Sequence, residues 1–151
     1  MRCLALIVVL PLMRFCPLSA QTNLEAVDYY EAIKIMQTID YQITDTPVVA
    51  IIDKGVNIEH KDLADNIWRN RFDVPANGLD DDGNGYADDL YGWNFSNNTN
   101  DVTVGGIGNW HGTPVNGIIG ANGIGICPAV RLMNIVKGES VESIIESLEY
   151  V

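Results

Sequence analysis

The chain has 151 residues, of which 20 are acidic and 9 are basic, so its formal net charge at pH 7 is −11. A surface this acidic repels phosphate backbones and attracts cations, which excludes nucleic acids as expected partners. The length and a hydrophobic content of 47% are sufficient for one domain with its own core.

Residues 1–20 have the pattern of an export signal. Arg2 supplies an early positive charge, an apolar stretch follows, and Ala20 is a small residue suited to cleavage. The apolar stretch of roughly ten residues is too short to cross a bilayer, so no stable membrane anchor is expected. We therefore expect a secreted or periplasmic protein. Cleavage leaves Cys127 as the single cysteine, which excludes an internal disulfide in the mature chain.

The segment 21–47 is predicted to form an amino-terminal helix and a linker. Apolar residues recur at helical spacing over residues 23–38, and Asn23 is a suitable cap. Residues 44–47 end this pattern with a proline. The β-branched run over 48–52 shows no alternation, which predicts a strand buried on both faces, as in a parallel sheet.

The remaining elements complete an α/β pattern. Residues 54–109 are irregular and rich in Asp, Asn and Gly, yet they contain aromatic residues, which favours a functional or metal-held loop over disorder. A second helix is predicted over 111–120 and a second strand over 130–136, and both belong with the first strand to a partial domain spanning 48–151. Ser140 is expected to cap a third helix. The apolar residues of that helix are Val141, Ile144, Ile145 and Leu148.

Two residues stand where an α/β sheet carries its chemistry. Asp53 follows the first predicted strand, and sites in such sheets lie beyond the carboxyl ends of the strands. His111 opens the second predicted helix. A serine nucleophile needs an imidazole base and a carboxylate that fixes the tautomer of that imidazole. Taken singly, Asp53 could instead be a polar strand terminus or helix cap, and His111 an ordinary loop histidine.

Three ordered blocks resemble the subtilisin-like serine proteases, or subtilases. Residues 49–56, Val-Ala-Ile-Ile-Asp-Lys-Gly-Val, together with the His-x-Asp-Leu of residues 60–63, are similar to the aspartate block of that family. Residues 111–121, with the sequence His-Gly-Thr-Pro-Val-Asn-Gly-Ile-Ile-Gly-Ala, are similar to its histidine block. Residues 123–130 resemble the entry to its next strand. The family's chain order of Asp, His and Ser matches the order found here.

The resemblance implies a parallel-sheet, three-layer fold and a secreted endopeptidase that acts on polypeptides. Asp53 would orient the imidazole and His111 would be the general base. The family's oxyanion asparagine and its Gly-Thr-Ser-Met-Ala nucleophile block are missing from the 151 residues, so the chain resembles only the amino-terminal part of a catalytic domain. We expect the chain alone to be inactive.

Three residues depart from the family pattern around this pair. Lys54 stands where the family usually has Ser or Thr, and its ammonium group could compete with His111 for Asp53. Pro114 and Asn116 replace the usual His and Ala of the histidine block. A proline in the first turn of a helix removes no intrahelical hydrogen bond, so Pro114 is compatible with the predicted helix.

Residues 80–91 resemble the front of a calcium loop. Oxygen-bearing residues occupy positions 1, 3, 5, 7 and 9, and a glycine at position 6 allows the sharp turn. The usual glutamate at position 12 is replaced by tyrosine, so Asp89 or a distant carboxylate such as Asp62 is expected to complete the ligand set. The alternative is a solvated acidic turn. The predicted calcium ligands are Asp80, Asp82, Asn84, the backbone carbonyl of Tyr86, and Asp88.

Other interpretations of the sequence remain open. A zinc site built from His60, His111 and Cys127 is conceivable, although no pair among them has metal-ligand spacing. The chain could be a non-catalytic, calcium-binding pseudo-protease that keeps the protease fold as a scaffold. It could also complete its sheet with a second, complementing chain, since unpaired strand edges and uncovered apolar faces drive such association.

Overall fold

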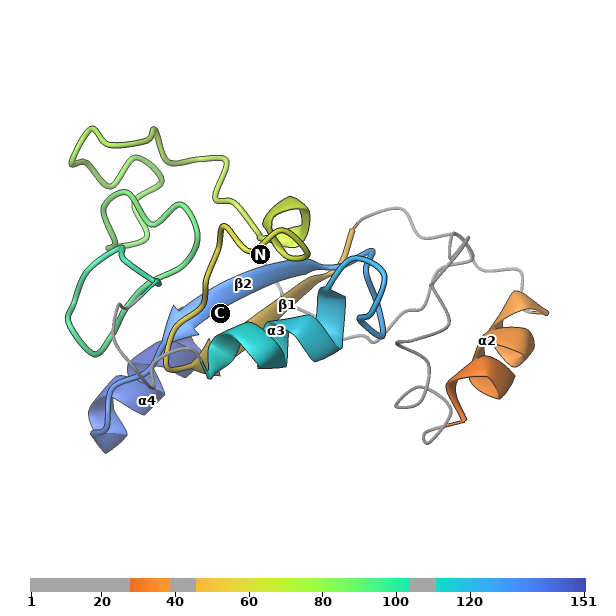
Figure 1. Cartoon of the computed structure of the whole chain (residues 1–151). Coiled ribbons are helices and arrows are strands. Elements are labelled where there is room, and N and C mark those ends of the chain that lie inside the picture. The colour runs from red at the N-terminus through yellow and green to blue at the C-terminus, as the bar shows by residue number, and fades with distance from the viewer. Residues whose placement is uncertain (1–27, 39–45, 104–110) are drawn as a thin grey trace.

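The computed structural model of the chain describes residues 28–38, 46–103 and 111–151 (Figure 1). The proposed export signal, residues 1–20, and the predicted cap Asn23 lie outside the described residues. None of the helices within these described ranges is both long enough and apolar enough to cross a membrane. In chain order the elements are α2 (Tyr29–Gln37), β1 (Val48–Asp53), a 3-10 turn (Ala64–Asn66), α3 (Gly112–Gly120), β2 (Arg131–Val136) and α4 (Val141–Glu149).

The two strands form a small parallel sheet. Their pairing starts with Val48 opposite Arg131 and ends with Asp53 opposite Val136, so the carboxyl ends of both strands lie at the same edge. The fold is therefore mixed α/β with a two-stranded parallel sheet, and α3 runs along this sheet (Figure 1). This arrangement confirms the α/β class and the parallel pairing of the strands. Asp53, the last residue of β1, lies at the carboxyl edge of the sheet.

The strands differ in burial. β2 is buried at every position after Arg131, whereas in β1 only Ile51 is buried. On the edge away from β1, β2 forms hydrogen bonds with the long loop that follows β1. Trp68 N donates to Leu132 O at 2.9 Å, and Val136 N donates to Trp93 O at 2.9 Å. Because most of β1 is only partly buried, the prediction that the first strand is buried on both faces is wrong for the described residues. Among these residues, only β2 is hydrogen-bonded along both of its edges.

The core lies between the sheet, the long loop and the segment that joins α3 to β2, and Val115 and Ile119 of α3 pack against it. Its buried apolar members are Ile51, Val56, Leu63, Val102, Ala121, Cys127, Val130, Leu132 and Val136. The loop contributes aromatic packing of its own: the ring of Tyr86 lies 5.0 Å from that of Trp93 and 5.5 Å from that of Phe95. The described part of this loop is thus irregular but packed, as the aromatic content predicted.

Helix α4 packs through its serine side. Ser140 caps the helix as predicted, accepting a hydrogen bond from Ser143 N at 3.1 Å. Ser143 and Ser147 are buried, whereas the apolar residues of the helix are exposed, from 37% at Ile144 to 68% at Val141. Ser143 lies very close to Gly138: a β-carbon added to Gly138 would lie 2.6 Å from the hydroxyl oxygen of Ser143. The contact therefore leaves room only for a small side chain at position 143.

Candidate active site and carboxylate cluster

Asp53 and His111, which lie 58 residues apart in the sequence, meet at the carboxyl end of β1. Nδ1 of His111 lies 2.8 Å from Oδ2 and 2.9 Å from Oδ1 of Asp53. A carboxylate only accepts hydrogen bonds, so Nδ1 of a neutral His111 carries the proton and Nε2 carries the free lone pair. The Asp53 side chain is 15% exposed and that of His111 is 68% exposed. The pair therefore combines a shielded carboxylate with an imidazole that an incoming group can reach.

Lys54 does not compete with His111 for the carboxylate. Its backbone N–H donates to Asp53 Oδ1 at 2.7 Å, and its ammonium lies 3.7 Å from Oε1 of Glu139. Both side chains of this ion pair are more than half exposed, and such pairs contribute little to stability. Lys54 thus supports Asp53 through the backbone while its charge is directed elsewhere.

The start of α3 is pressed against the turn that follows β1. A β-carbon on Gly112 would lie 2.3 Å from Gly55 O, so no larger residue fits there without displacing the backbone. Gly55 itself has φ of 120°, a conformation that glycine adopts without strain. One residue further along, Thr113 Oγ1 accepts a hydrogen bond from Asn57 N at 2.9 Å. These contacts fix the backbone of His111 beside Asp53.

The three residues of the conceivable zinc site do not converge. In the parts of the chain with described positions, the only group of three or more potential metal-ligating residues consists of aspartates. His60 instead accepts a hydrogen bond at Nδ1 from Asp62 N, at 3.3 Å, and Cys127 is buried in the core. The zinc interpretation is therefore wrong for this arrangement.

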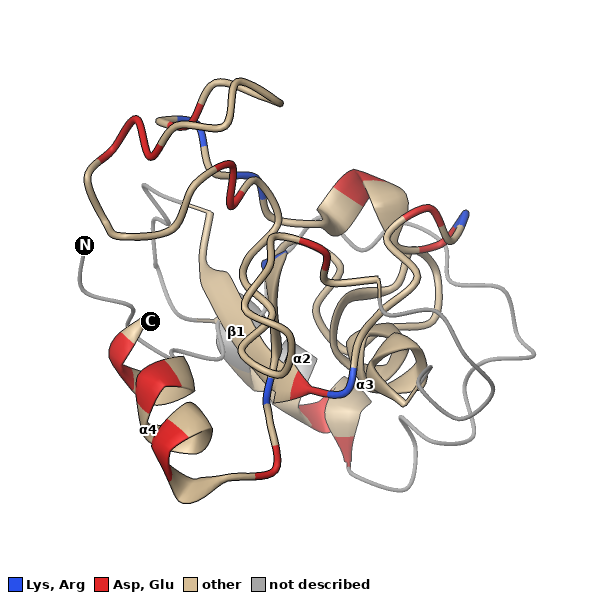
Figure 2. Ribbon diagram, turned by 90° about the vertical axis from the view of Figure 1, so that its left-hand side faces the viewer, with Lys and Arg blue, Asp and Glu red and all other residues tan. Residues whose placement is uncertain are grey.

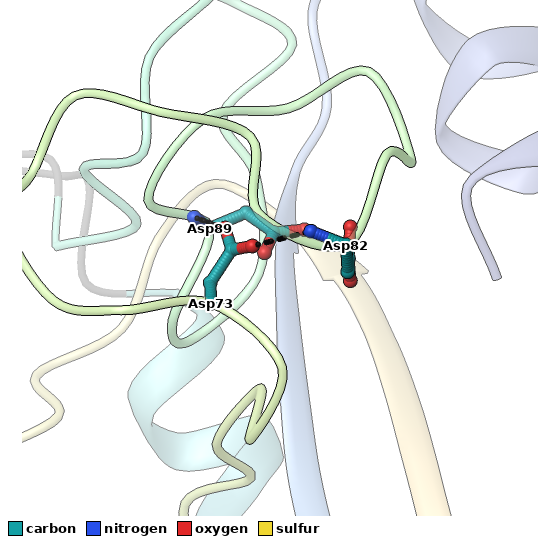
Figure 3. Close-up of side chains that lie close together, drawn as sticks. All are labelled: Asp73, Asp82 and Asp89. Atoms are coloured by element: carbon teal, nitrogen blue, oxygen red, sulfur yellow. Dashed lines mark hydrogen bonds between the residues drawn. The ribbon is translucent and has the colours of Figure 1, made fainter.

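A carboxylate cluster lies in the long loop (Figure 3). Asp73, Asp82 and Asp89 each offer an oxygen within 4.8 Å of the other two, and Asp73 and Asp89 are buried. Asp73 accepts hydrogen bonds from the backbone N–H groups of Asp81, Asp82 and Asp89. Buried carboxylates at this separation repel each other unless a cation lies among them, so the cluster could bind a metal ion.

Asp89 lies at the most buried point of the cluster. Its oxygens accept hydrogen bonds from Asn70 Nδ2 at 2.6 Å, from Asn84 Nδ2 at 2.9 Å and from the hydroxyl of Tyr150. Burial raises the pKa of the Asp89 carboxyl above its ordinary value, against the lowering effect of these donors, and the charge of Asp73 raises it further. A cation bound beside Asp89 would favour the ionised carboxylate.

The predicted calcium ligands are only partly gathered there. Asp82 belongs to the cluster, whereas the carboxylate of Asp80 accepts from Asn84 N and Gly85 N, and that of Asp88 accepts from Asn77 N and Gly78 N. Asn84 directs its amide nitrogen toward Asp82 and Asp89, while its oxygen accepts from Tyr86 N. The ligand set read from the spacing therefore remains a prediction.

Comparison with known proteins identifies the family. The Subtilase family, Peptidase S8, matches residues 44–148, which include both members of the Asp–His pair and the carboxylate cluster. The chain belongs to the subtilase family. The family assignment supports a serine peptidase at the family level.

The relatives of this subtilase are much longer proteins. It is 46% identical over 82 residues to subtilisin-like protease 1 of Plasmodium vivax, an alignment that covers 52% of this chain and 12% of the relative. It is 42% identical over 91 residues to subtilisin-like protease 1 of Plasmodium falciparum, covering 58% and 13%, respectively. For the Plasmodium berghei protein the identity is 37% over 100 residues, covering 59% and 16%. The chain thus matches only about an eighth to a sixth of the length of these relatives.

Asp73 is the member of the cluster that sequence reasoning missed. It precedes the acidic run by seven residues and has no spacing that distinguishes it from other loop aspartates. Asp62, which the sequence offered as a distant ligand, lies instead 2.8 Å from the ammonium of Lys61. Only the folding of the subtilase loop back on itself brings Asp73 to the acidic run.

Proposed function

We propose that this subtilase chain contributes the carboxylate and the imidazole of a catalytic triad in a secreted serine endopeptidase. The observation that carries the proposal is the contact of 2.8 Å between His111 Nδ1 and Asp53 Oδ2 at the carboxyl end of β1. The serines of the chain lack the context of the family's nucleophile block. The third member of the triad and the oxyanion asparagine therefore come from sequence outside these 151 residues.

The geometry suits the chemistry of peptide-bond cleavage. Asp53 holds the Nδ1–H of His111, which leaves Nε2 to take the proton of a serine hydroxyl as its oxygen attacks the peptide carbonyl. The imidazolium then gives this proton to the leaving amine as the peptide bond breaks and an acyl-enzyme remains. Water, activated by the same imidazole, hydrolyses the acyl-enzyme. The carboxylate of Asp53 stabilises the charged imidazolium in both stages.

The test uses the secreted protein as its cells produce it. Its intact mass is compared with the 16.6 kDa of the 151 residues, and it is treated with a fluorophosphonate, which attaches to an activated serine. We expect a larger, labelled protein that cleaves a fluorogenic peptide. Asp53→Asn and His111→Ala should each lower the rate by roughly four to six orders of magnitude. Proteolysis that persists in His111→Ala, with His60→Ala as the matched control, contradicts the proposal.

A three-layer fold, completed by further polypeptide, is part of this proposal. Support comes from the half-buried β1 and from the exposed apolar residues of α4, since parallel sheets are ordinarily covered on both faces. A complementing chain would supply the missing cover. Hydrolysis that appears only when the 151-residue chain is mixed with a polypeptide carrying the nucleophile block supports complementation. A mixture that remains inactive, although both parts bind each other, opposes it.

We include calcium as a structural ion of the long loop. Asp73, Asp82 and Asp89 offer only oxygen ligands, which suit a hard cation. Asp89 is a buried carboxylate whose negative charge such a cation would neutralise. The predicted ligands Asp80, Asn84, Tyr86 and Asp88 remain candidates for the same ion. Calcium would pin the loop and take no part in bond cleavage. A rise in melting temperature with calcium, reversed by a chelator, is the expected result.

The same cluster supports the second candidate function, a non-catalytic calcium-binding scaffold. This candidate predicts calcium-dependent folding and an intact mass that fits the 151 residues or their processed form, with no fluorophosphonate labelling. Export is proposed for both candidates from the pattern of residues 1–20. Amino-terminal sequencing of the secreted protein should begin at Gln21, whereas a start at Met1 contradicts cleavage.

A further inference from the structure

A buried pair of amides connects α3 to β2, and the mechanism above does not use it. Asn116 of α3 has no exposed surface, and Asn134 of β2 is 3% exposed. Asn116 Nδ2 donates to Asn134 Oδ1 at 2.9 Å, and Asn134 Nδ2 donates to Leu132 O at 3.1 Å. We infer that Asn116 and Asn134 are positioning residues that hold His111 in register with Asp53, an inference that rests on the proposed function.

The path from this pair to the imidazole is short. Asn116 Nδ2 also donates to Gly112 O at 2.7 Å, and Gly112 is the residue that follows His111. The same Gly112 packs against Gly55, at the turn that follows Asp53. The first turn of α3 is therefore held from the sheet side by the amide pair and from the strand end by the glycine contact. A rotation or slide of α3 along β2 would break the hydrogen bond between Asn116 and Asn134 and carry His111 away from Asp53.

The pair contributes geometry more than stability. Oδ1 of Asn116 is buried and makes no hydrogen bond among the described residues, so the amide is only partly satisfied. Two apolar side chains of similar total size would fill the site without an unsatisfied acceptor, and such double replacements are often close to neutral for folding. Apolar contacts, however, have no direction. A hydrogen bond that is short and angle-dependent fixes the position of the helix along the strand.

The experiment is nitrogen NMR of the full chain labelled with ¹⁵N-histidine, at about pH 9, where an ordinary imidazole is neutral. The spectrum reports which ring nitrogen carries the proton. Wild-type His111 should be in the Nδ1–H form, because Asp53 accepts from Nδ1. His60 should be in the opposite, Nε2–H form, because its Nδ1 accepts from Asp62 N, and it is an internal reference in every variant.

The main variant is Asn116→Ala/Asn134→Val, which removes both amides together. We expect the ratio of Nδ1–H to Nε2–H in His111 to fall about twofold or more, because the Asp53 hydrogen bond loosens, while His60 is unchanged. Asn116→Ser is the second variant: serine can still bond to Gly112 O but is too short to reach Asn134. It should change His111 in the same direction even if the double variant folds poorly.

Ser147→Ala is the matched control. Ser147 is fully buried and donates to Ser143 O four residues earlier at 2.7 Å, as Asn116 does to Gly112, but it lies on α4. A merely structural role predicts that the Asn116 and Ser147 variants both melt earlier and leave the tautomer of His111 unchanged, and that result overturns the inference. If wild-type His111 is not in the Nδ1–H form, the inference and the proposed Asp–His pairing both fail. An Nδ1–H wild type with unaffected variants overturns the positioning role alone.

Discussion

Tyr150 donates a hydrogen bond from its hydroxyl to Oδ2 of Asp89, at 2.5 Å, and so joins the end of α4 to the carboxylate cluster 61 residues earlier. The ring of Tyr150 also packs against Tyr86 at 5.0 Å and Phe95 at 5.9 Å. Burial, together with the hydrogen bond to Asp89 and the negative charge there, raises the pKa of the Tyr150 hydroxyl above its ordinary value. The hydrogen bond and the ring packing of Tyr150 therefore connect the acidic loop to α4, a helix that itself carries acidic residues along its length (Figure 2).

Tyr150→Phe should destabilise the chain while keeping its aromatic packing. The variant removes one hydrogen bond to a carboxylate, and bonds of this kind contribute about 1.5–3 kcal/mol. The measurement is the free energy of unfolding in urea. Tyr86→Phe is the control, because it removes a hydroxyl from the same ring cluster that donates no hydrogen bond within the described residues. Equal losses in the two variants contradict a specific role for the Tyr150–Asp89 bond.

Two glycines of α3 should respond in opposite directions to alanine. At Gly112 a β-carbon would meet Gly55 O at 2.3 Å, so Gly112→Ala forces the helix away from the end of β1 and costs about 1–3 kcal/mol. At Gly117 a β-carbon meets nothing within 4 Å, so Gly117→Ala should gain up to about 1 kcal/mol from helix propensity. Urea unfolding of both variants measures the difference. A neutral Gly112→Ala shows that α3 is not packed against the turn after Asp53.

Two adjacent aspartates of the acidic loop, Asp88 and Asp89, distinguish the ligand set predicted from the sequence spacing from the cluster formed in the tertiary structure. The carboxylate of Asp89 lies in the cluster, whereas that of Asp88 accepts from Asn77 N and Gly78 N. Asp89→Asn should therefore weaken calcium binding more than Asp88→Asn, as measured by titration calorimetry. At calcium concentrations about 100 times the dissociation constant, the wild type should gain about 2.7 kcal/mol of stability. A larger loss of affinity for Asp88→Asn would favour the ligand set expected from the spacing.

Cys127 reports on the junction of α3 and β2. The residue is 5% exposed, and burial raises the pKa of its thiol above the ordinary value, against the lowering effect of a backbone hydrogen bond. The folded chain thus holds the thiol proton more tightly than the unfolded chain. The resulting stability is present below the unfolded thiol pKa, near 8.5, and is lost as the pH rises through the folded value.

Labelling with iodoacetamide at about pH 8 should consequently be slow for Cys127 in the folded chain and fast in urea. Peptide mass spectrometry separates its signal from those of Cys3 and Cys16. A labelling rate that is the same with and without urea shows that the core around Cys127 is open.

The sequence by itself determined the order of the elements and the identity of the Asp–His pair. Strand and helix patterns are local, so the run before Asp53, the small-residue helix after His111 and the cap at Ser140 could be recognised without tertiary information. A parallel sheet then predicts where the carboxyl end of the first strand lies. The family motifs depend on the same local blocks, and the match over residues 44–148 agrees with them.

Tertiary structure decided everything that depends on which surfaces meet. The spacing of the acidic run predicted ligands within one loop, but Asp73 reaches the cluster only through the path of the chain, and Asp88 turns away from it. Helix α4 is amphipathic in sequence, yet Ser143 and Ser147 are its buried residues, and the close approach of Gly138 leaves room only for a small side chain at position 143. Local periodicity identifies a face, whereas burial of that face depends on a partner surface contributed by residues distant in the sequence.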